Sequence, residues 1–233
     1  MESAGFQSLS SWRRWGAEVT RMVLEKLVFA TTVEALFVRG LGAGLCPTVR
    51  ARLKQAGLDL ARPLAVSYPL EEWKTFVHIA SLALYPQLCP AEAHGWMGVH
   101  FLEGYLQTYM GRMVAGLAPA LGPWRTLERM RRDFRGGTNF SEVKLMERAP
   151  RHAEVWVNDV LSDYPSFAAG LISRAQQVAG ARDVQVDVLS FDGTACTFGI
   201  RWSDSKLTGT EIGVGPLRPA GGWAVTGRSP PPG

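Results

Sequence analysis

The hydrophobic period of the chain changes near Asn139, and this change limits the folds that are open to it. Up to about Arg135, apolar residues recur with the period of about 3.6 residues that is typical of helices. Beyond Asn139 they alternate with polar residues with a period of about 2, as in half-buried strands. Helices followed by strands predict an α+β protein, in which an N-terminal helical part packs on a C-terminal antiparallel sheet.

The helical half contains segments with recognisable start and stop signals. A β-prone run at 26–31 is followed by the capping-box spacing of Thr31 and Glu34, while Pro47 and Pro90 stand where a first helical turn tolerates proline. We expect helices at about 31–39, 47–56, 68–85, 90–117 and 123–135. Apolar residues surround most of the fourth segment, which predicts a central and largely buried helix.

The strand half predicts two hairpins around one helix. We expect strands at 140–148, 153–160, 184–188 and 196–202 and a helix at 165–180. The second hairpin turns at Asp192-Gly193, a dipeptide favoured in tight turns. This ββαββ order predicts a single domain over 21–202 with one shared core. We expect a loosely ordered N-terminus at 1–20 and a flexible, Gly/Pro-rich tail at 203–233.

Composition and charge exclude several classes of protein. Apolar residues make up 46% of the chain, enough for a packed core, and a formal net charge of +4 gives no specific signal for nucleic-acid binding. The 3 cysteines are far apart and lack zinc-ligand or disulfide-framework spacing, so no metal site is indicated. No signal peptide and no membrane span are recognisable. We therefore expect a cytoplasmic protein.

Short motifs that resemble those of a known family are spread along most of the chain. In order they are Val28–Phe37, Gly57–Leu60, Pro63-Leu64, Tyr68-Pro69, Trp73, Gly104–Thr108, Gly111-Arg112, Gly122-Pro123, Leu127–Met130, Phe134-Arg135 and Asn139, followed by the β-α-β-β pattern to Trp202. On these residues the chain resembles an uncharacterised paralogous family of myxobacterial proteins with a domain of unknown function. The resemblance implies no activity.

The order of elements is also similar to a broader group of folds. Helices followed by hairpin, helix and hairpin resemble the haem-nitric-oxide-binding, vinyl-reductase-like and vesicle-tethering-subunit group. That resemblance implies a small hydrophobic ligand or a partner protein, by analogy of fold alone. The Tyr-x-Ser-x-Arg haem-propionate motif of the haem-binding members is not found in this sequence.

Two groups of side chains are candidates for binding a ligand or a partner. Arg125, Arg129 and Arg132 line one face of the basic helix 124–135, where they would grip an anionic ligand or an acidic partner. Tyr105 and Thr108 place hydroxyl groups in a mainly apolar helix and would face a pocket. The alternative interpretation of the first group is a solvated face with internal ion pairs, and that of the second is helix packing.

Two histidines are candidate haem ligands, should haem be present. His78 and His100 both lie among apolar residues on expected helices, so either would ligate iron in an apolar pocket. The alternative is an imidazole at the edge of the core, hydrogen-bonded to its neighbours.

No complete catalytic motif occurs in the sequence. There is no Gly-x-Ser-x-Gly elbow, and no cysteine has a recognisable histidine partner. We therefore expect a non-enzymatic cytoplasmic module that binds a small hydrophobic ligand or a partner protein in signalling or regulation. The alternatives are a haem-based sensor and an enzyme of unknown reaction whose catalytic residues meet only in the fold. The sequence specifies no cofactor.

Overall fold

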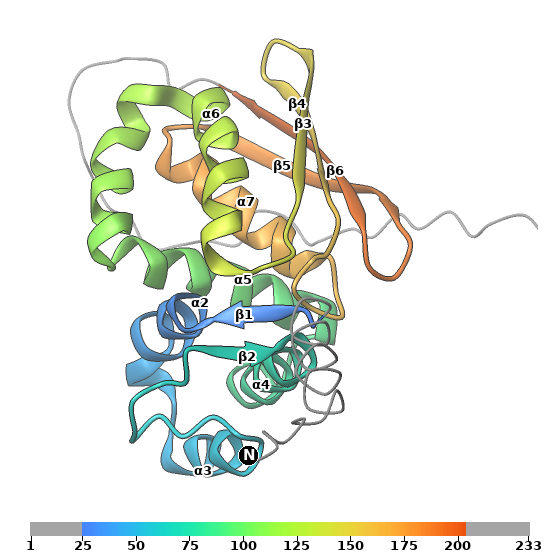
Figure 1. Ribbon diagram of the computed structural model, residues 1–233. Coiled ribbons are helices and arrows are strands. Elements are labelled where there is room, and N and C mark those ends of the chain that lie inside the picture. The colour runs from blue at the N-terminus through green and yellow to red at the C-terminus, as the bar shows by residue number, and fades with distance from the viewer. Residues whose placement is uncertain (1–24, 204–233) are drawn as a thin grey trace, which may run out of the picture.

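The computed structural model describes residues 25–203, apart from the side chains of 132–135. The elements in this part of the chain are, in order, β1 (Leu27–Phe29), α2 (Ala30–Val33), the π-helix η1 (Glu34–Gly40), the 3-10 turn η2 (Gly42–Gly44), α3 (Pro47–Gln55), β2 (Ser67–Pro69), α4 (Leu70–Leu84), α5 (Pro90–Leu106), α6 (Tyr109–Gly137), β3 (Val143–Ala149), β4 (His152–Val157), α7 (Ser166–Val178), β5 (Arg182–Phe191) and β6 (Cys196–Ser203). Figure 1 shows the N-terminal helices on one side and the larger sheet with α6 and α7 on the other. The predicted α+β class and the ββαββ order of the second half are confirmed.

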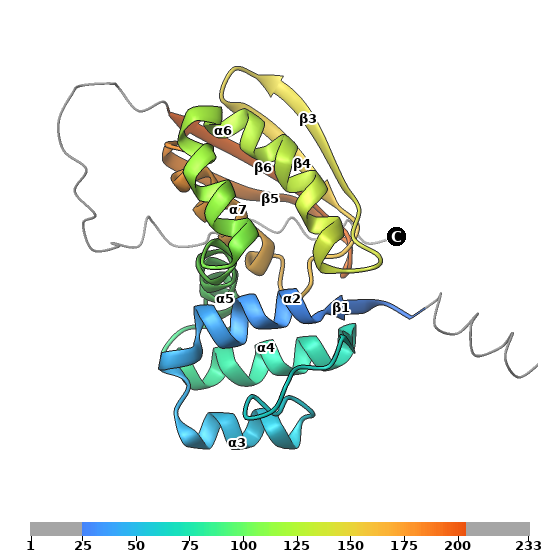
Figure 2. The same ribbon diagram turned by 60° about the vertical axis from the view of Figure 1, so that its left-hand side comes forward.

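The C-terminal sheet is antiparallel and has the strand order β3-β4-β6-β5. Its inner face is apolar because alternate residues of each strand point the same way, so that Val155 on β4 pairs with Phe198 on β6 and both are buried. Helices α6 and α7 cover this face (Figure 2). The β5–β6 turn forms as predicted: Gly193 has a positive φ of 98°, and Asp192 Oδ1 accepts hydrogen bonds from the backbone N–H groups of Thr194 and Ala195.

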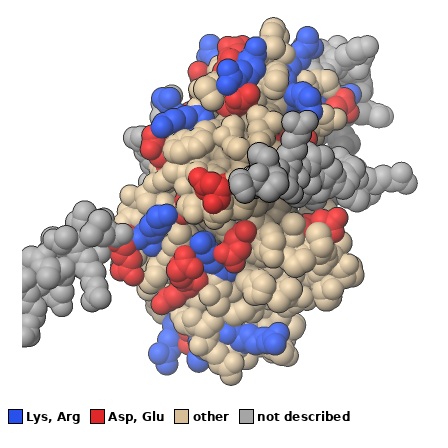
Figure 3. Space-filling model, turned by 90° about the vertical axis from the view of Figure 1, so that its right-hand side faces the viewer, with Lys and Arg blue, Asp and Glu red and all other residues tan. Residues whose placement is uncertain are grey.

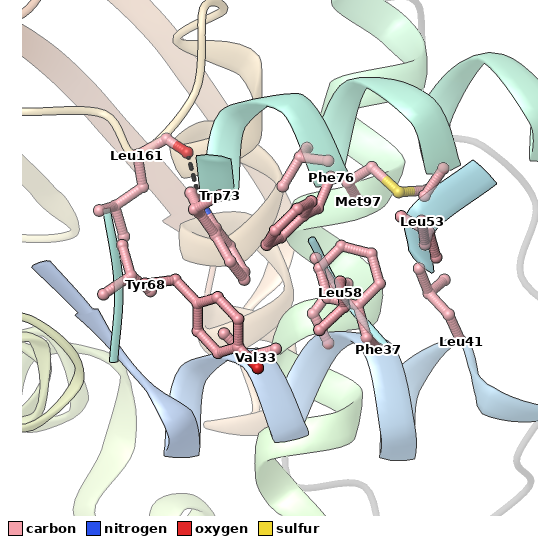
Figure 4. Close-up of a cluster of buried hydrophobic side chains, with 14 of the residues drawn as sticks. Val33, Phe37, Leu41, Leu53, Leu58, Tyr68, Trp73, Phe76, Met97 and Leu161 are labelled. Atoms are coloured by element: carbon pink, nitrogen blue, oxygen red, sulfur yellow. Dashed lines mark hydrogen bonds between the residues drawn. The ribbon is translucent and has the colours of Figure 1, made fainter. Parts of the chain in front are cut away.

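The N-terminal helices have a core of their own, built around aromatic rings. Phe37 meets Trp73 and Phe76 edge to face, with ring centroids 5.8 and 6.2 Å apart (Figure 4). Helix α3 packs Leu53 against this cluster. The indole Nε1 of Trp73 donates a hydrogen bond of 2.8 Å to the carbonyl oxygen of Leu161, which ties α4 to the segment after β4.

Helix α5 lies between the two halves and packs closely on both. A Cβ atom added to Gly98 would collide with the carbonyl oxygen of Phe167 on α7, and one added to Gly104 would collide with that of Ala35 on η1. Glycine at these two positions therefore allows both neighbouring backbones to approach α5. The predicted central helix is confirmed, although its predicted end is not.

The predicted single helix over 90–117 is wrong, because α5 ends at Leu106 and α6 begins at Tyr109. Thr108 caps the new helix by accepting a hydrogen bond of 3.0 Å from the backbone N–H of Gly111. The predicted helix from 123 is confirmed as the second half of α6, because Gly122, with a non-helical φ of 78°, separates it from the first half. The chain therefore changes direction twice where the sequence predicts one break.

Three other predictions differ from the structure in detail. The segment predicted as an α-helix over 31–39 is mostly the π-helix η1, which is wider than an α-helix and follows only one turn of α-helix. Ser67–Pro69, where we expect a helix to begin, forms β2 and pairs with β1 in an antiparallel ladder. β3 begins at Val143 and β4 ends at Val157, so both strands are shorter than predicted.

The predicted terminal segments lie mostly outside the described residues. This holds for the whole of 1–20 and for the tail beyond Ser203, which is itself the last residue of β6. Within residues 25–203, no helix combines the length and the apolar composition that crossing a membrane requires.

Candidate functional site

A mainly apolar cavity lies between α5, α6 and α7. It contains about 820 Å³ of space free of protein atoms, including the part open to solvent. The residues that line it are Thr32, Phe101, Leu102, Tyr105, Leu106, Val114, Ala118, Leu121, Thr126, Arg129, Met130, Gly137, Thr138, Leu161, Leu171, Ala175 and Val178. A mainly apolar lining with a few polar groups is typical of sites that bind small molecules.

The kink in α6 allows one helix to form two walls of this cavity. Val114, Ala118 and Leu121 share a face of its first half, at helical spacing. After Gly122 the helix turns back, and its second half brings Arg129 to the same cavity. The turn is held locally, because Thr126 Oγ1 donates a hydrogen bond of 2.9 Å to the carbonyl oxygen of Gly122.

The other walls come from α5 and α7. On α5, Phe101 and Tyr105 lie one turn apart, and on α7 Leu171, Ala175 and Val178 follow the same face. Ala118 on α6 and Ala175 on α7 are small where larger apolar side chains would fill the space between the helices. The short side chains at these two positions leave part of the space between the helices open.

The lining has polar groups at its edge. Thr32 Oγ1 donates a hydrogen bond of 2.9 Å to the carbonyl oxygen of Gly137, and Thr138 Oγ1 donates one of 2.6 Å to Ser141 Oγ. A hydroxyl oxygen that donates its proton keeps lone pairs for accepting a further hydrogen bond. Among the described lining residues Arg129 is the single cation, and it is half-buried. A guanidinium beside apolar walls favours an anionic or strongly hydrogen-bond-accepting group.

The structure brings together two of the five predicted binding residues. Tyr105 and Arg129 both line the cavity, whereas the side chain of Arg125 is exposed outside it. Thr108 does not line the cavity; its hydroxyl caps α6 and donates to the carbonyl oxygen of Tyr105. The side chain of Arg132 lies outside the described residues.

Neither histidine considered for haem lies at the cavity. His78 is exposed on α4. His100 is half-buried, and its Nε2 atom lies 2.6 Å from the hydroxyl of Tyr85, while its Nδ1 atom lies 3.5 Å from Glu103. Both ring nitrogens of His100 therefore face protein partners.

A polar network continues from His100 across the α5–α7 contact. Glu103 Oε1 lies 3.3 Å from the Nε atom of Arg174 on α7. The hydrogen bond from His100, and then the charge of Arg174, hold the pKa of Glu103 below its ordinary value against the effect of burial. Burial and the neighbouring Glu103 raise the pKa of Tyr85. The network joins the C-terminal cap of α4 to α5 and α7, and the sequence alone did not indicate it, because Tyr85 and Arg174 are far from His100 and Glu103 in the chain.

A second buried polar pair lies between α5 and the segment after β4. His94 is 1% exposed, and its Nδ1 atom lies 2.5 Å from the hydroxyl of Ser162. Its Nε2 atom has no hydrogen-bond partner among the described residues. Burial, and to a smaller extent the nearby His78, lower the pKa of His94 to about 4, although Asp163 opposes the shift. His94 is therefore neutral near pH 7.

Sequence reasoning missed most of the cavity wall. Val114, Ala118 and Leu121 recur at helical spacing, which marks an apolar face, but the same pattern is expected of a filled core. The small side chains of Ala118 and Ala175 are the local signal of open space. No group of three or more His, Cys, Asp or Glu side chains within 25–203 is arranged to hold a metal ion.

Comparison with known proteins gives a family and a fold. A family model described as "Protein of unknown function (DUF2378)" matches residues 26–203. A search of curated proteins gave no significant match. Among solved structures, an H-NOX protein from S. oneidensis in the Fe(II)NO ligation state is similar with a TM-score of 0.52 and 12% sequence identity, covering 76% of this chain and 99% of that chain.

Further structures of the same kind agree with this match. A triple mutant of the S. oneidensis protein in the Fe(II) state has a TM-score of 0.53 and 13% identity, covering 76% of this chain and 96% of that one. An unliganded Fe(II) mutant from K. algicida has a TM-score of 0.50 and 12% identity, with the same coverage of 76% and 96%. At these identities the likeness shows the fold: this chain has an H-NOX-like arrangement of helices and sheet.

The residues of this chain do not fit a histidine-ligated haem. An iron ligand has to reach the cavity, and neither a histidine nor a cysteine is among its described lining residues. The haem-propionate motif is incomplete as well, because Tyr164 and Ser166 have its spacing but Ala168 stands where it requires arginine. We therefore derive no role for this chain through haem.

Proposed function

The chain belongs to the DUF2378 family, whose function is unknown, and we propose a role for it from its own residues. The protein is a non-enzymatic module that binds a small, mainly apolar ligand in the cavity between α5, α6 and α7. The observation that carries the proposal is the cavity itself, which has apolar walls and a single cation, Arg129, among its described lining residues.

The lining specifies the general chemistry of the ligand. Its larger part must be apolar, because a polar group against Phe101, Leu121 or Leu171 would lose its hydration without gaining a hydrogen bond. One anionic or accepting group would lie near Arg129, where a charge-assisted hydrogen bond compensates for lost hydration. The likeness in fold to a protein with NO bound at Fe(II) supports a sensor-like, ligand-binding role.

Ligand binding is tested by native mass spectrometry and by titration with a fluorescent fatty-acid probe. Freshly purified protein should carry excess mass or bind the probe, and Arg129→Gln should weaken binding about tenfold, because a hydrogen bond to a charged group contributes roughly 1.5–3 kcal/mol. Arg125→Gln is the matched control, since it removes the same charge from an exposed position of the same helix.

A second variant tests whether the ligand occupies the cavity. Ala175→Phe should reduce binding of the probe by filling the space, whatever the role of the arginine. If neither Ala175→Phe nor Arg129→Gln weakens binding relative to Arg125→Gln, the ligand binds elsewhere and the proposal is wrong.

An absorption spectrum of the same sample tests the haem-sensor hypothesis, which the lining of the cavity does not favour. A Soret band that is lost in His100→Ala would support the haem-sensor hypothesis against the geometry described above. We also predict that the protein is cytoplasmic, acts in signalling and comes from a myxobacterium.

A further inference from the structure

The first half of α6 carries an apolar stripe that faces solvent. Met110, Met113 and Leu117 are 56%, 50% and 49% exposed, and their i, i+3, i+7 spacing places them on one side of the helix. Tyr109, at the start of the helix, is 72% exposed. Single exposed apolar residues are common on protein surfaces, whereas a contiguous group marks an interaction site.

This half-helix is unusual in composition as well as in exposure. Between Tyr109 and Gly122, Arg112 is the single charged residue. A helix that is apolar on all sides is normally buried, yet this one lies at the outer edge of the molecule, on the left in Figure 1. The adjacent face of the same half-helix lines the cavity, and Met110, Met113 and Leu117 are exposed beside it.

We propose that this stripe, formed by Tyr109, Met110, Met113 and Leu117, docks in the plane of an anionic lipid bilayer. A helix that lies in the interface buries its apolar side roughly 5–10 Å deep and keeps basic residues at the headgroups. Tyrosine is favoured at that level because its ring is apolar and its hydroxyl is polar. Contact of this kind requires no membrane-spanning helix, and none is found in residues 25–203.

The charges of α6 fit negatively charged lipid. Arg112 lies within the apolar half, and Arg125 and Arg131 are exposed on the second half, while Glu128 is the single acidic residue among the described side chains of this helix. Exposed basic residues on the same helix as an apolar stripe are attracted to anionic headgroups. On the opposite side of the molecule, Figure 3 shows Lys and Arg interspersed with Asp and Glu, without a patch of one sign.

The shape favours a bilayer over a protein partner. Stable protein interfaces bury about 1,600 Å² in total, and four side chains on one half-helix offer much less. Insertion of a few side chains into lipid has no such requirement. The stripe also continues into the cavity wall, since Met110 and Leu117 lie one turn from Val114 and Leu121.

Flotation of the full chain with lipid vesicles tests the proposal. The protein should float with vesicles of phosphatidylcholine and phosphatidylglycerol, less with phosphatidylcholine alone, and less as salt is raised. The double variant Met113→Glu/Leu117→Glu should bind about tenfold or more weakly, because it removes two apolar side chains from the lipid and adds like charge. Leu82→Glu is the control, since Leu82 is 46% exposed on α4, away from the stripe.

Three outcomes would overturn the proposal. The first is no flotation of the unaltered chain with anionic vesicles, and the second is equal binding by the double variant and Leu82→Glu. The third is a dimer in lipid-free analytical ultracentrifugation that the double variant abolishes, which would assign the stripe to a second copy of the chain. Circular dichroism checks that the variants fold, and ligand binding in the cavity is measured without vesicles, so the two proposals fail independently.

Discussion

At the scale of single residues, His94 has the clearest effect on stability. Its folded-state pKa is about 4, against an ordinary value of 6.5. Above pH 6.5 the imidazole is neutral in both states and contributes nothing to the pH dependence. As pH falls from 6.5 to 4 the unfolded chain binds a proton that the folded chain does not, so stability decreases. The free energy of unfolding should fall by roughly 3 kcal/mol near pH 4 from this effect, since each pKa unit corresponds to about 1.36 kcal/mol.

Urea unfolding at several pH values measures this effect. Carboxylates also titrate in this range, so the comparison is with His94→Gln, whose stability should fall less between pH 6.5 and 4 than that of the unaltered chain. His152→Gln, on β4, is the matched control and should follow the unaltered chain. Equal slopes for the His94 variant and the unaltered chain would contradict a depressed pKa at this position.

At the scale of elements, the contacts of α5 depend on glycine. Gly98→Ala would force the backbones of α5 and α7 apart, and we expect the free energy of unfolding to fall by about 3 kcal/mol. The added Cβ would meet backbone atoms of α7, so no side chain could move aside to make room for it. Gly116→Ala is the control: a Cβ there meets nothing within 4 Å, and alanine favours a helix interior by roughly 0.5–1 kcal/mol. Denaturant unfolding of both variants measures the difference, and a Gly98→Ala protein as stable as Gly116→Ala would show that α5 and α7 can separate without cost.

Some helices and strands were predictable from the sequence, and others were not. The β5–β6 hairpin was predictable because its strand alternation and its Asp192-Gly193 turn are local signals. The break between α5 and α6 was not, because the residues around Thr108 contain no proline and only tertiary packing selects the cap over a continuous helix. For the same reason the cavity wall was recognisable as an apolar face but not as a cavity. Arg129 and Tyr105 were singled out because their chemistry stands out on otherwise ordinary helices; both line the cavity, and their role in binding stays a prediction.

At the scale of the whole molecule, the two apolar cores are joined rather than separate. Phe101 on α5 packs against both clusters. Leu161, in the segment after β4, belongs to the N-terminal cluster, where its carbonyl oxygen accepts a hydrogen bond from Trp73. Lys26, next to β1, forms an ion pair of 3.0 Å with Asp159, whose side chain is 3% exposed. These links make independent unfolding of either half costly, because separation would expose the faces of α5 and leave Asp159 without its cation.

We therefore predict that the region 21–202 unfolds as one cooperative unit. Native-state hydrogen exchange should give the same free energy of opening for slowly exchanging amides of α4 and of β6, because both are released only by global unfolding. Different limiting values for the two elements would divide the chain into two domains. A small apolar ligand in the cavity should raise both values together, since the cavity is built from α5, α6 and α7 and a ligand that binds only the folded state stabilises every element that unfolds with it.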